Sequence, residues 1–338
     1  MKILGKIALI LAFIALMAGC SGKKGDTING KPSSGGKTLE VLLIVPDDIY
    51  RGELTDTINR YFARVCEGLN QPEPLFDVVQ LNPAGFYKSE MFQKHRNIII
   101  IDLKDTNKNK LYSSKDYKAA PQSYFEFSVS SRDSLYSLIR GTADTIIKSF
   151  YDNEYRRIGA TFKKFENTKA TTAIRNRFDL TLVLSEDFYV ATEADNFMWI
   201  RKETQDVSLG LMIYKTAFDE SLLAESKIID LRNKITKENV PGPSHGNFMG
   251  IESRVPLIRK DVMLCGNVAA IETRGLWRML YEPNVKITAF MGGAFVNYCF
   301  ADKDKKNLIM IDGFVQSPKL SKRDQLMQLE AVIRNIKF

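Results

Sequence analysis

The sequence contains few of the residues that build metal centres and nucleophilic sites, with two histidines and four cysteines among its 338 residues. His95 and His245 are too far apart for the HExxH spacing of zinc proteases, and no two cysteines have CxxC spacing. Ser244 and His245 are neighbours, and adjacent side chains do not reach each other as a catalytic dyad. We therefore expect no catalytic residue, no metal and no cofactor.

Long hydrophobic runs and a strong charge imbalance are also missing. The longest apolar run is Ile7 to Ala18, with 12 residues, whereas a membrane-spanning helix needs about 20. The formal net charge is +8, spread along the chain without a basic stripe interleaved with aromatic residues. We therefore expect no membrane-spanning helix and no nucleic-acid partner.

The first twenty residues have the pattern of an export signal. Lys2 and Lys6 precede the apolar run, which ends in Met17-Ala18-Gly19-Cys20. These last four residues resemble the lipobox of bacterial lipoproteins, in which the cysteine receives a diacylglyceryl group and becomes the first mature residue. We therefore predict a signal peptide over residues 1–19 and lipidation of Cys20, which would anchor the protein to a membrane. The alternative is an ordinary secretory signal with Cys20 as a bystander.

The segment after Cys20 reads as a flexible tether. Ser21 to Lys37 is rich in Gly, Ser, Lys and Pro and has no hydrophobic periodicity. No acidic cluster like the surface-export signals of Bacteroidota lipoproteins follows Cys20. We therefore predict a lipidated cysteine and tether over residues 20–37, with the protein on the periplasmic face of the outer membrane.

The remaining chain alternates short strands with helices, and hairpin connections outnumber βαβ crossovers. This pattern predicts an α+β fold of mainly antiparallel sheets with flanking helices, in an N-terminal half (38–176) and a C-terminal half (177–338). We expect helices over 53–69, from 130 to about 150, from 219 to before Pro241, and from 321 onward. We expect strands over 39–45, 75–81, 97–103, 124–129, 179–185, 197–204, 209–216, 255–264, 268–280, 294–301 and 307–315, and a polar loop over 105–122.

A weak internal repeat leaves open whether the two halves are related. Residues 43–50 (LIVPDDIY) align with residues 182–189 (LVLSEDFY), and Leu, Asp and Tyr are identical. Eight positions can also match by chance.

The most distinctive segments of the sequence lie in the C-terminal half. They read GPSHGNFM at 242–249, ETRGLW at 272–277, MGGAF at 291–295, DGFVQSP at 312–318 and KRD at 322–324, followed by QLEA at 328–331. With the lipobox, these segments resemble the Bacteroidota lipoprotein family named domain of unknown function 4837, over almost the whole mature chain. His245 and Ala294 depart from its pattern. The resemblance implies a cell-envelope lipoprotein and carries no activity.

One pair of residues in these segments has the chemistry of a ligand site. Glu272 and Arg274 lie two apart on an expected strand, so their side chains share a face, and Trp277 falls on the opposite face. Arg274 could hold a carboxylate or phosphate and Glu272 could act as a base, near the glycine-rich loop 242–246 with Ser244 and His245. The alternative, which we favour, is a structural ion pair with Trp277 in the core.

The cysteines other than Cys20 leave a second question open. Cys66, Cys265 and Cys299 cannot all pair with one another. In an oxidising compartment Cys265 and Cys299 could form a disulfide, and buried free thiols are the alternative.

Two functions fit these observations. The first is a non-enzymatic binding or scaffolding lipoprotein that presents its body to a protein or polymer of the cell envelope. The second is an envelope hydrolase or small-ligand-binding enzyme that uses Glu272 and Arg274 near the loop 242–246. We favour the first, because the chain has an anchor and a tether but no recognisable nucleophile, metal centre or cofactor motif.

The anchor can be tested directly. Cys20→Ser should move the protein from the membrane fraction to the soluble fraction of lysed cells, because each buried methylene of the lost acyl chains contributes about 0.8 kcal/mol. Immunoblots of the two fractions measure the distribution, with Cys265→Ser as the control. A Cys20→Ser protein that still sediments with membranes would contradict the predicted lipidation.

Overall fold

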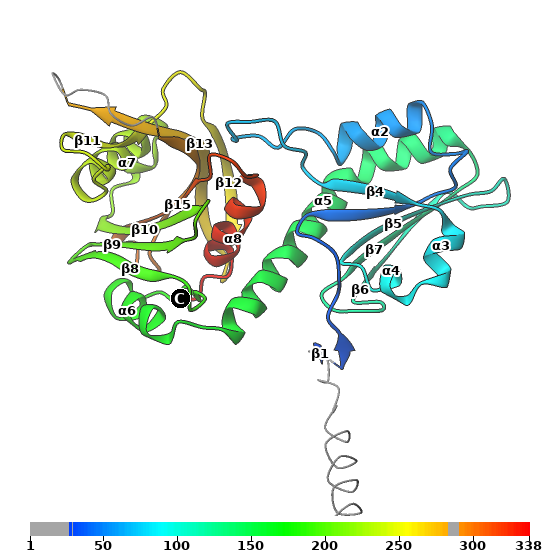
Figure 1. The fold of residues 1–338 in the computed structure, drawn as a ribbon, viewed down its shortest axis with the longest axis horizontal. Coiled ribbons are helices and arrows are strands. Elements are labelled where there is room, and N and C mark those ends of the chain that lie inside the picture. Colours follow the sequence, from blue (N-terminus) through cyan, green and yellow to red (C-terminus); the bar gives the residue numbers. More distant parts are fainter. Residues whose placement is uncertain (1–26, 29, 283–290) are drawn as a thin grey trace, which may run out of the picture.

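The computed structural model describes residues 27–28, 30–282 and 291–338, so the predicted leader and Cys20 lie outside the described residues. A five-stranded sheet and an eight-stranded sheet lie at opposite ends of the molecule, and the long helix α5 (Arg132–Lys164) runs between them (Figure 1). A short pair of strands, β1 (Thr27–Ile28) and β2 (Lys31–Pro32), precedes them and lies within the predicted tether. Ser34 N donates to Ala120 O and Gly35 N to Lys94 O, so residues 31–37 pack on the N-terminal half and the prediction of a flexible tether is wrong for them. The predicted α+β class is confirmed.

The N-terminal sheet has a parallel centre. Its strand order is β4-β3-β5-β7-β6, and only β6 runs antiparallel to its neighbour. The nearly continuous apolar runs at 41–45 and 98–101 are buried because both faces of these strands are covered. The elements of this half are β3 (Glu40–Ile44), α2 (Glu53–Tyr61), β4 (Asp77–Leu81), α3 (Pro83–Lys88), α4 (Glu90–Gln93), β5 (Asn97–Leu103), β6 (Lys110–Lys115) and β7 (Ser123–Val129).

The C-terminal sheet is antiparallel throughout. Its path is β11-β13-β14-β15-β10-β9-β8, and the long strand β13 also pairs with β12. The elements are α6 (Thr168–Phe178), β8 (Tyr189–Ala194), β9 (Phe197–Glu203), β10 (Ser208–Ala217), the 3-10 helix η1 (Glu220–Leu223), α7 (Glu225–Asn239), β11 (Asn247–Ile251), β12 (Ile258–Leu264), β13 (Val268–Tyr281), β14 (Gly292–Ala301), β15 (Asn307–Gln316) and α8 (Arg323–Arg334).

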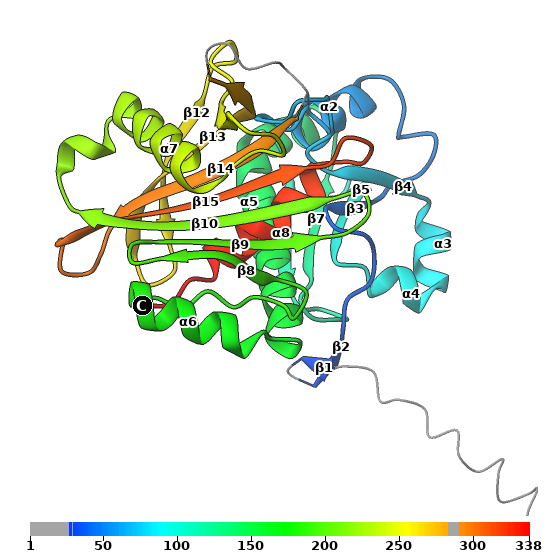
Figure 2. The same cartoon turned by 60° about the vertical axis from the view of Figure 1, so that its left-hand side comes forward.

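Helices cover both faces of this curved sheet (Figure 2). Helix α7 covers one face through Ile228 and Ile235, and α8 covers the other through Leu326, Leu329 and Ile333. The α8 face belongs to a core cluster that continues through α5 into the N-terminal sheet. The two halves therefore share one hydrophobic core.

The helix predicted over 53–69 is wrong in its second part. Helix α2 ends at Tyr61, and the chain forms an antiparallel loop in which Cys66 N donates to Glu73 O and Leu75 N to Arg64 O. The apolar residues at positions 62, 65 and 69 continue the helical spacing, but Phe62 is buried in the core and Val65 is 60% exposed. This loop, residues 62–76, extends toward the C-terminal half.

Three other expectations differ from the structure. The predicted loop 105–122 contains the edge strand β6, whose polar residues face solvent on a sheet edge. The predicted strand 179–185 makes only isolated bridges, such as Thr181 with Lys337, while β8 and β11 were not predicted. The repeat of 43–50 at 182–189 has no counterpart in topology, because the first copy ends a parallel strand and the second precedes an antiparallel one.

Glu73, in the loop 62–76, forms the N-terminal cap of helix α8. Its carboxylate accepts hydrogen bonds from Lys322 N at 2.8 Å and Arg323 N at 2.9 Å, and from the Ser321 hydroxyl. Burial of Glu73 disfavours its ionised form, but these hydrogen bonds outweigh that effect and lower its pKa. Because α8 has no side-chain cap of its own, one half of the chain terminates a helix of the other.

Glu73→Ala should lower the free energy of unfolding by about 2 to 3 kcal/mol, because buried amides of α8 lose a charged hydrogen-bond partner. Urea denaturation followed by circular dichroism measures this change. Glu67→Ala is the matched control in the same loop, since its exposed pair with Lys260 should contribute less than about 1 kcal/mol. Equal stabilities of the two variants would contradict the cap.

Candidate functional site

The predicted pair lies in β13, and its side chains point toward α8 and α5. Glu272 is 4% exposed, and Trp277 lies in the separate core cluster under α7. The indole nitrogen of Trp277 donates to Val315 O at 3.2 Å. The predicted placement of Glu272 and Arg274 on one face, with Trp277 in the core on the other, is confirmed.

Three ion pairs link four charged residues in the order Arg334, Glu272, Arg274 and Glu330, and we call this set the four-charge network. Glu272 accepts from Arg274 Nε at 2.7 Å and from Arg334 Nη2 at 2.6 Å. Arg274 Nη1 donates to Glu330 at 2.7 Å, and the hydroxyl of Tyr155 on α5 donates to the other Glu330 oxygen at 2.9 Å. Each carboxylate oxygen therefore has a donor, and two positive charges balance two negative ones.

The network keeps Glu272 ionised. Burial by itself would raise the pKa of this carboxyl, but the neighbouring guanidinium of Arg274, and after it that of Arg334, lower it to about 2. Glu330 and Glu272 in turn raise the pKa of Arg274 against its own burial. A carboxylate with so low a pKa is a weak base near neutral pH, where general bases need a pKa close to 7.

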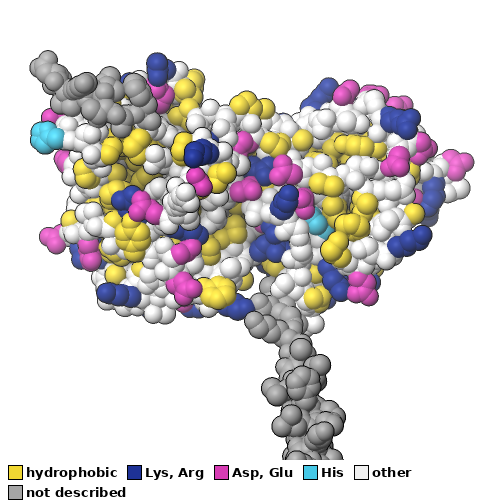
Figure 3. Space-filling view, viewed as in Figure 1, with side chains coloured by type: hydrophobic (Ala, Val, Ile, Leu, Met, Phe, Trp, Pro, Cys, Tyr) yellow, Lys and Arg dark blue, Asp and Glu magenta, His cyan; other side chains and the backbone are white. Residues whose placement is uncertain are grey.

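A cavity of about 790 Å³ opens above the network at the junction of the two halves. Its walls come from Cys66 in the loop 62–76, Tyr151 on α5 and Lys260 on β12. Charged side chains of both signs gather over this junction in the space-filling view (Figure 3). Burial raises the pKa of the Cys66 thiol to about 11, so this thiol stays protonated.

Ser244 and His245 lie elsewhere. The backbone N of Ser244 donates to Asn247 Oδ1 at 3.1 Å, and His245 is exposed. Asn247 pairs with Tyr281, which is seven residues from Arg274 along β13, roughly 23 Å at about 3.3 Å per residue. The prediction that the loop 242–246 lies near Glu272 and Arg274 is therefore wrong, because the strand that carries the pair is long and the loop sits at its far end.

The glycine-rich segments have structural explanations. Gly242 N donates to Asn247 O, and Gly246 has φ of 73°, which closes a tight turn. A side chain at Gly293 would place its Cβ 1.9 Å from Val315 O and 3.0 Å from the Trp277 indole nitrogen. Gly293 thus allows the close approach of β14 to its neighbours.

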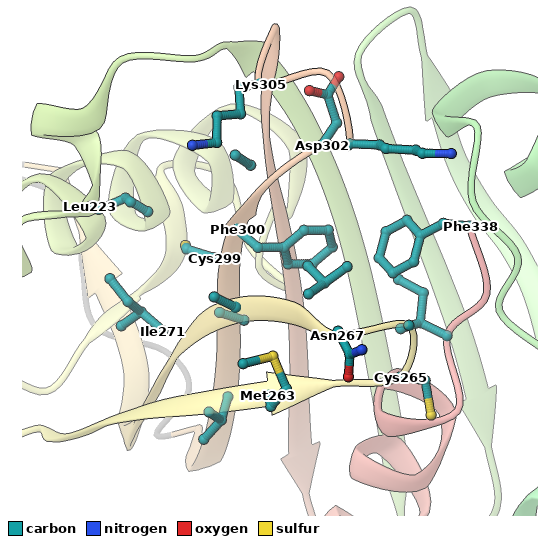
Figure 4. A pocket seen from close by; sticks show the side chains of 18 of the residues that line it. Leu223, Met263, Cys265, Asn267, Ile271, Cys299, Phe300, Asp302, Lys305 and Phe338 are labelled. Carbon is teal, nitrogen blue, oxygen red and sulfur yellow. The ribbon is translucent and has the colours of Figure 1, made fainter.

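Two further cavities surround the tip of the hairpin β12–β13, and sequence reasoning missed them. The larger, of about 1310 Å³, lies between this hairpin, the end of β14 and the C-terminal Phe338 (Figure 4). The smaller, of about 440 Å³, lies between α5 and α8. Apolar residues from distant parts of the chain line both, and no local sequence pattern marks such a set.

The cysteine question is settled for the described residues. Cys66, Cys265 and Cys299 are free thiols; Cys265 is exposed and Cys299 is buried. The proposed disulfide between Cys265 and Cys299 is therefore absent.

His95, the other histidine of the sequence, is buried, with Nε2 2.8 Å from Glu40 and Nδ1 3.2 Å from Asn97 O.

Within the described residues, no three His, Cys, Asp or Glu side chains are grouped so that they could hold a metal ion. The same part of the chain contains no helix long and apolar enough to cross a membrane.

Family comparisons divide the chain near the end of α5. The family described as Domain of unknown function (DUF4837) matches residues 167–335, and the one described as Domain of unknown function (DUF8532) matches residues 34–163. The chain belongs to the DUF4837 family through its C-terminal half. The expectation that this resemblance covers almost the whole mature chain is corrected, because a second domain accounts for the N-terminal half. The boundary at 176/177 stays a prediction.

Likeness to solved structures is remote. The Ran-binding protein Mog1p of Saccharomyces cerevisiae aligns with 9% identity and a TM-score of 0.30, over 47% of this chain and 89% of its own. The human StarD13 lipid transfer and protein localization domain aligns with 10% identity and a TM-score of 0.19, over 50% of this chain and 94% of its own. These scores carry no functional argument. No curated protein matches the sequence.

Glu272→Gln should lower the free energy of unfolding at pH 7 by about 3 kcal/mol, because two partly buried guanidinium groups lose the buried carboxylate that they share. Urea denaturation measures this change. Glu203→Gln is the control, since its exposed pair with Arg201 on the same sheet should contribute less than about 1 kcal/mol. An unchanged stability of Glu272→Gln would show that the network does not hold β13 against α8.

The stability difference between the wild type and Glu272→Gln should also depend on pH. The pKa of Glu272 is lowered from its ordinary value of 4.5 to about 2 in the folded protein. Its stabilisation is therefore complete above pH 4.5 and is lost as the pH falls toward 2. Denaturation midpoints between pH 7 and pH 2.5 should converge for the two proteins, and a constant difference would contradict the assignment.

Proposed function

We propose that this protein is an outer-membrane lipoprotein of the Bacteroidota cell envelope, facing the periplasm, with a non-enzymatic binding or scaffolding role. The export signal and the lipobox ending at Cys20 support the anchor. The resemblance of the chain to the DUF4837 family of Bacteroidota lipoproteins agrees with a location in the cell envelope. This resemblance implies no activity. The partner would be a protein or a polymer of the envelope.

The observation that carries the non-enzymatic part is the internal satisfaction of the four-charge network. Glu272 accepts from two guanidinium groups, and Glu330 accepts from Arg274 and Tyr155. The ion pairs hold β13 against α8 within the C-terminal half, and the hydrogen bond from Tyr155 to Glu330 links α8 to α5, so their clearest role is structural. A rigid body on a tether suits the presentation of a binding surface.

The alternative, an envelope hydrolase or small-ligand-binding enzyme, has less support. Its base would be Glu272, whose low pKa makes it a weak proton acceptor. Its glycine-rich loop, with Ser244 and His245, lies at the other end of β13. Loss of cellular function in Glu272→Gln at an unchanged amount of folded protein would favour the enzyme after all.

The partner can be sought in the native membrane. The acylated full chain, purified by affinity from outer membranes in mild detergent, should bring down a protein in stoichiometric amount or a defined envelope polymer. Mass spectrometry identifies the protein, and sugar analysis identifies the polymer. Cells carrying Cys20→Ser provide the control, because that variant lacks the predicted anchor. Recovery of the chain alone would contradict a scaffolding role.

A further inference from the structure

Three cavities meet around the tip of the hairpin β12–β13. Cys265 lines all three of them. Met263 is shared by the cavity of about 1310 Å³ and the cavity above the four-charge network, and Ile336 and Lys337 are shared by the two cavities outside it. We call the two cavities outside the network, of about 1310 and 440 Å³, the hairpin-tip groove.

The walls of the groove are largely apolar. Phe300 and Phe338 stack edge to face at 5.7 Å, and Figure 4 shows them beside the hairpin that carries Met263 and Cys265. Met263 is 58% exposed and Phe338 is 48% exposed. Ligand sites in proteins are concave and mostly apolar, with volumes of about 300 to 1,000 Å³ and a few polar groups. The hairpin-tip groove has this composition and ample room.

The charged residues of the groove favour an anionic ligand. The cavity between α5 and α8 is lined by Arg156, Lys163 and Lys337 and by no acidic residue. Arg156 pairs with Asp116 and Lys163 with Glu166, so Lys337 is the cation of this lining that is available to an anion. The larger cavity is lined by Lys303 and Lys305, besides Lys337, and by the acids Glu220 and Asp261. The remaining acid there, Asp302, is occupied by the backbone amides of Lys306 and Asn307 and by the Asn307 side chain.

We infer that the hairpin-tip groove binds a free anionic amphiphile, with its acidic head near Lys337 and its hydrocarbon chain against the exposed side chains of Met263 and Phe338. A polypeptide segment is a poorer occupant, because its backbone would need hydrogen-bond partners that apolar walls do not supply. A flat bilayer surface cannot fill a recess between two helices and a hairpin. The inference rests on the proposed binding role and names the ligand class.

Oleate provides a defined probe, and Cys265 provides a local readout. The mature chain, residues 20–338 with Cys20→Ser, needs no detergent and lacks the Cys20 thiol. Among the described cysteines Cys265 is the exposed one, and burial raises the pKa of Cys66 and of Cys299. Saturating oleate, below its micelle concentration, should slow alkylation of Cys265 by iodoacetamide at least fivefold, as measured by peptide mass spectrometry. Oleyl alcohol, which lacks the charge, should protect less.

Two matched pairs of variants locate the effect. Met263→Glu should raise the oleate concentration needed for half-protection at least tenfold, whereas Met91→Glu, at a methionine that is 70% exposed on α4, should leave it unchanged. Lys337→Glu should weaken protection in the same way, and Lys88→Glu on α3 should not. Both methionines and both lysines are exposed, so none of these changes should unfold the protein.

Each other outcome would overturn the inference. Unchanged alkylation with oleate would show that the groove is not an amphiphile site. Equal effects of Met263→Glu and Met91→Glu would indicate nonspecific binding. Protection by phosphatidylglycerol vesicles but not by oleate would assign the face to a membrane surface. If a partner co-purifies with wild type and Met263→Glu alike while oleate fails, only this inference fails. If oleate protects and no partner is found, only the scaffolding role fails.

Discussion

Helix α8 depends on buried charges at both of its ends, and the arrangement of the two halves depends on α8. At its start, Glu73 from the N-terminal half supplies the missing cap. Toward its end, Glu330 and Arg334 join β13 and α5 through the four-charge network. A buried charge that loses its partner is costly, and two of these contacts cross between the halves, from Glu73 to the α8 amides and from Tyr155 to Glu330. These two contacts favour the docked arrangement. The hydrophobic core that the two halves share behind α8 also favours the docked arrangement.

The two kinds of cavity follow from this docking. The cavity above the network is bounded by the ion-paired side chains of the network. Because these charges are already paired with one another, they are poorly suited to activate a substrate. The hairpin-tip groove lies where α5, α8 and the hairpin β12–β13 approach without filling the space between them. Its apolar walls and basic lining suit binding. This contrast between the two cavities is the ground on which we propose a binding role.

Much of the local structure was predictable from residue spacing. The alternation of a strand placed Glu272 and Arg274 together and Trp277 opposite, and helical spacing predicted α8. In the sequence, the segment KRD at 322–324 was distinctive but had no assigned role. The structure explains it, because the amides of Lys322 and Arg323 bind Glu73, about 250 residues away in the sequence. No local pattern encodes that contact. The loop 62–76 was likewise mistaken for helix, since its apolar spacing continues that of α2.

The sequence by itself determined the elements whose apolar period matches one buried face, such as the hairpin β9–β10, the strand β13 and the helix α8. The export signal is also a local pattern, and its consequence at Cys20 stays a prediction. Tertiary structure alone decided that Glu272 is a clamped ion rather than a base, that Ser244 and His245 lie at the far end of β13, and that three cavities meet at Cys265. The physical reason is that pKa, proximity and concavity depend on which distant residues exclude water together.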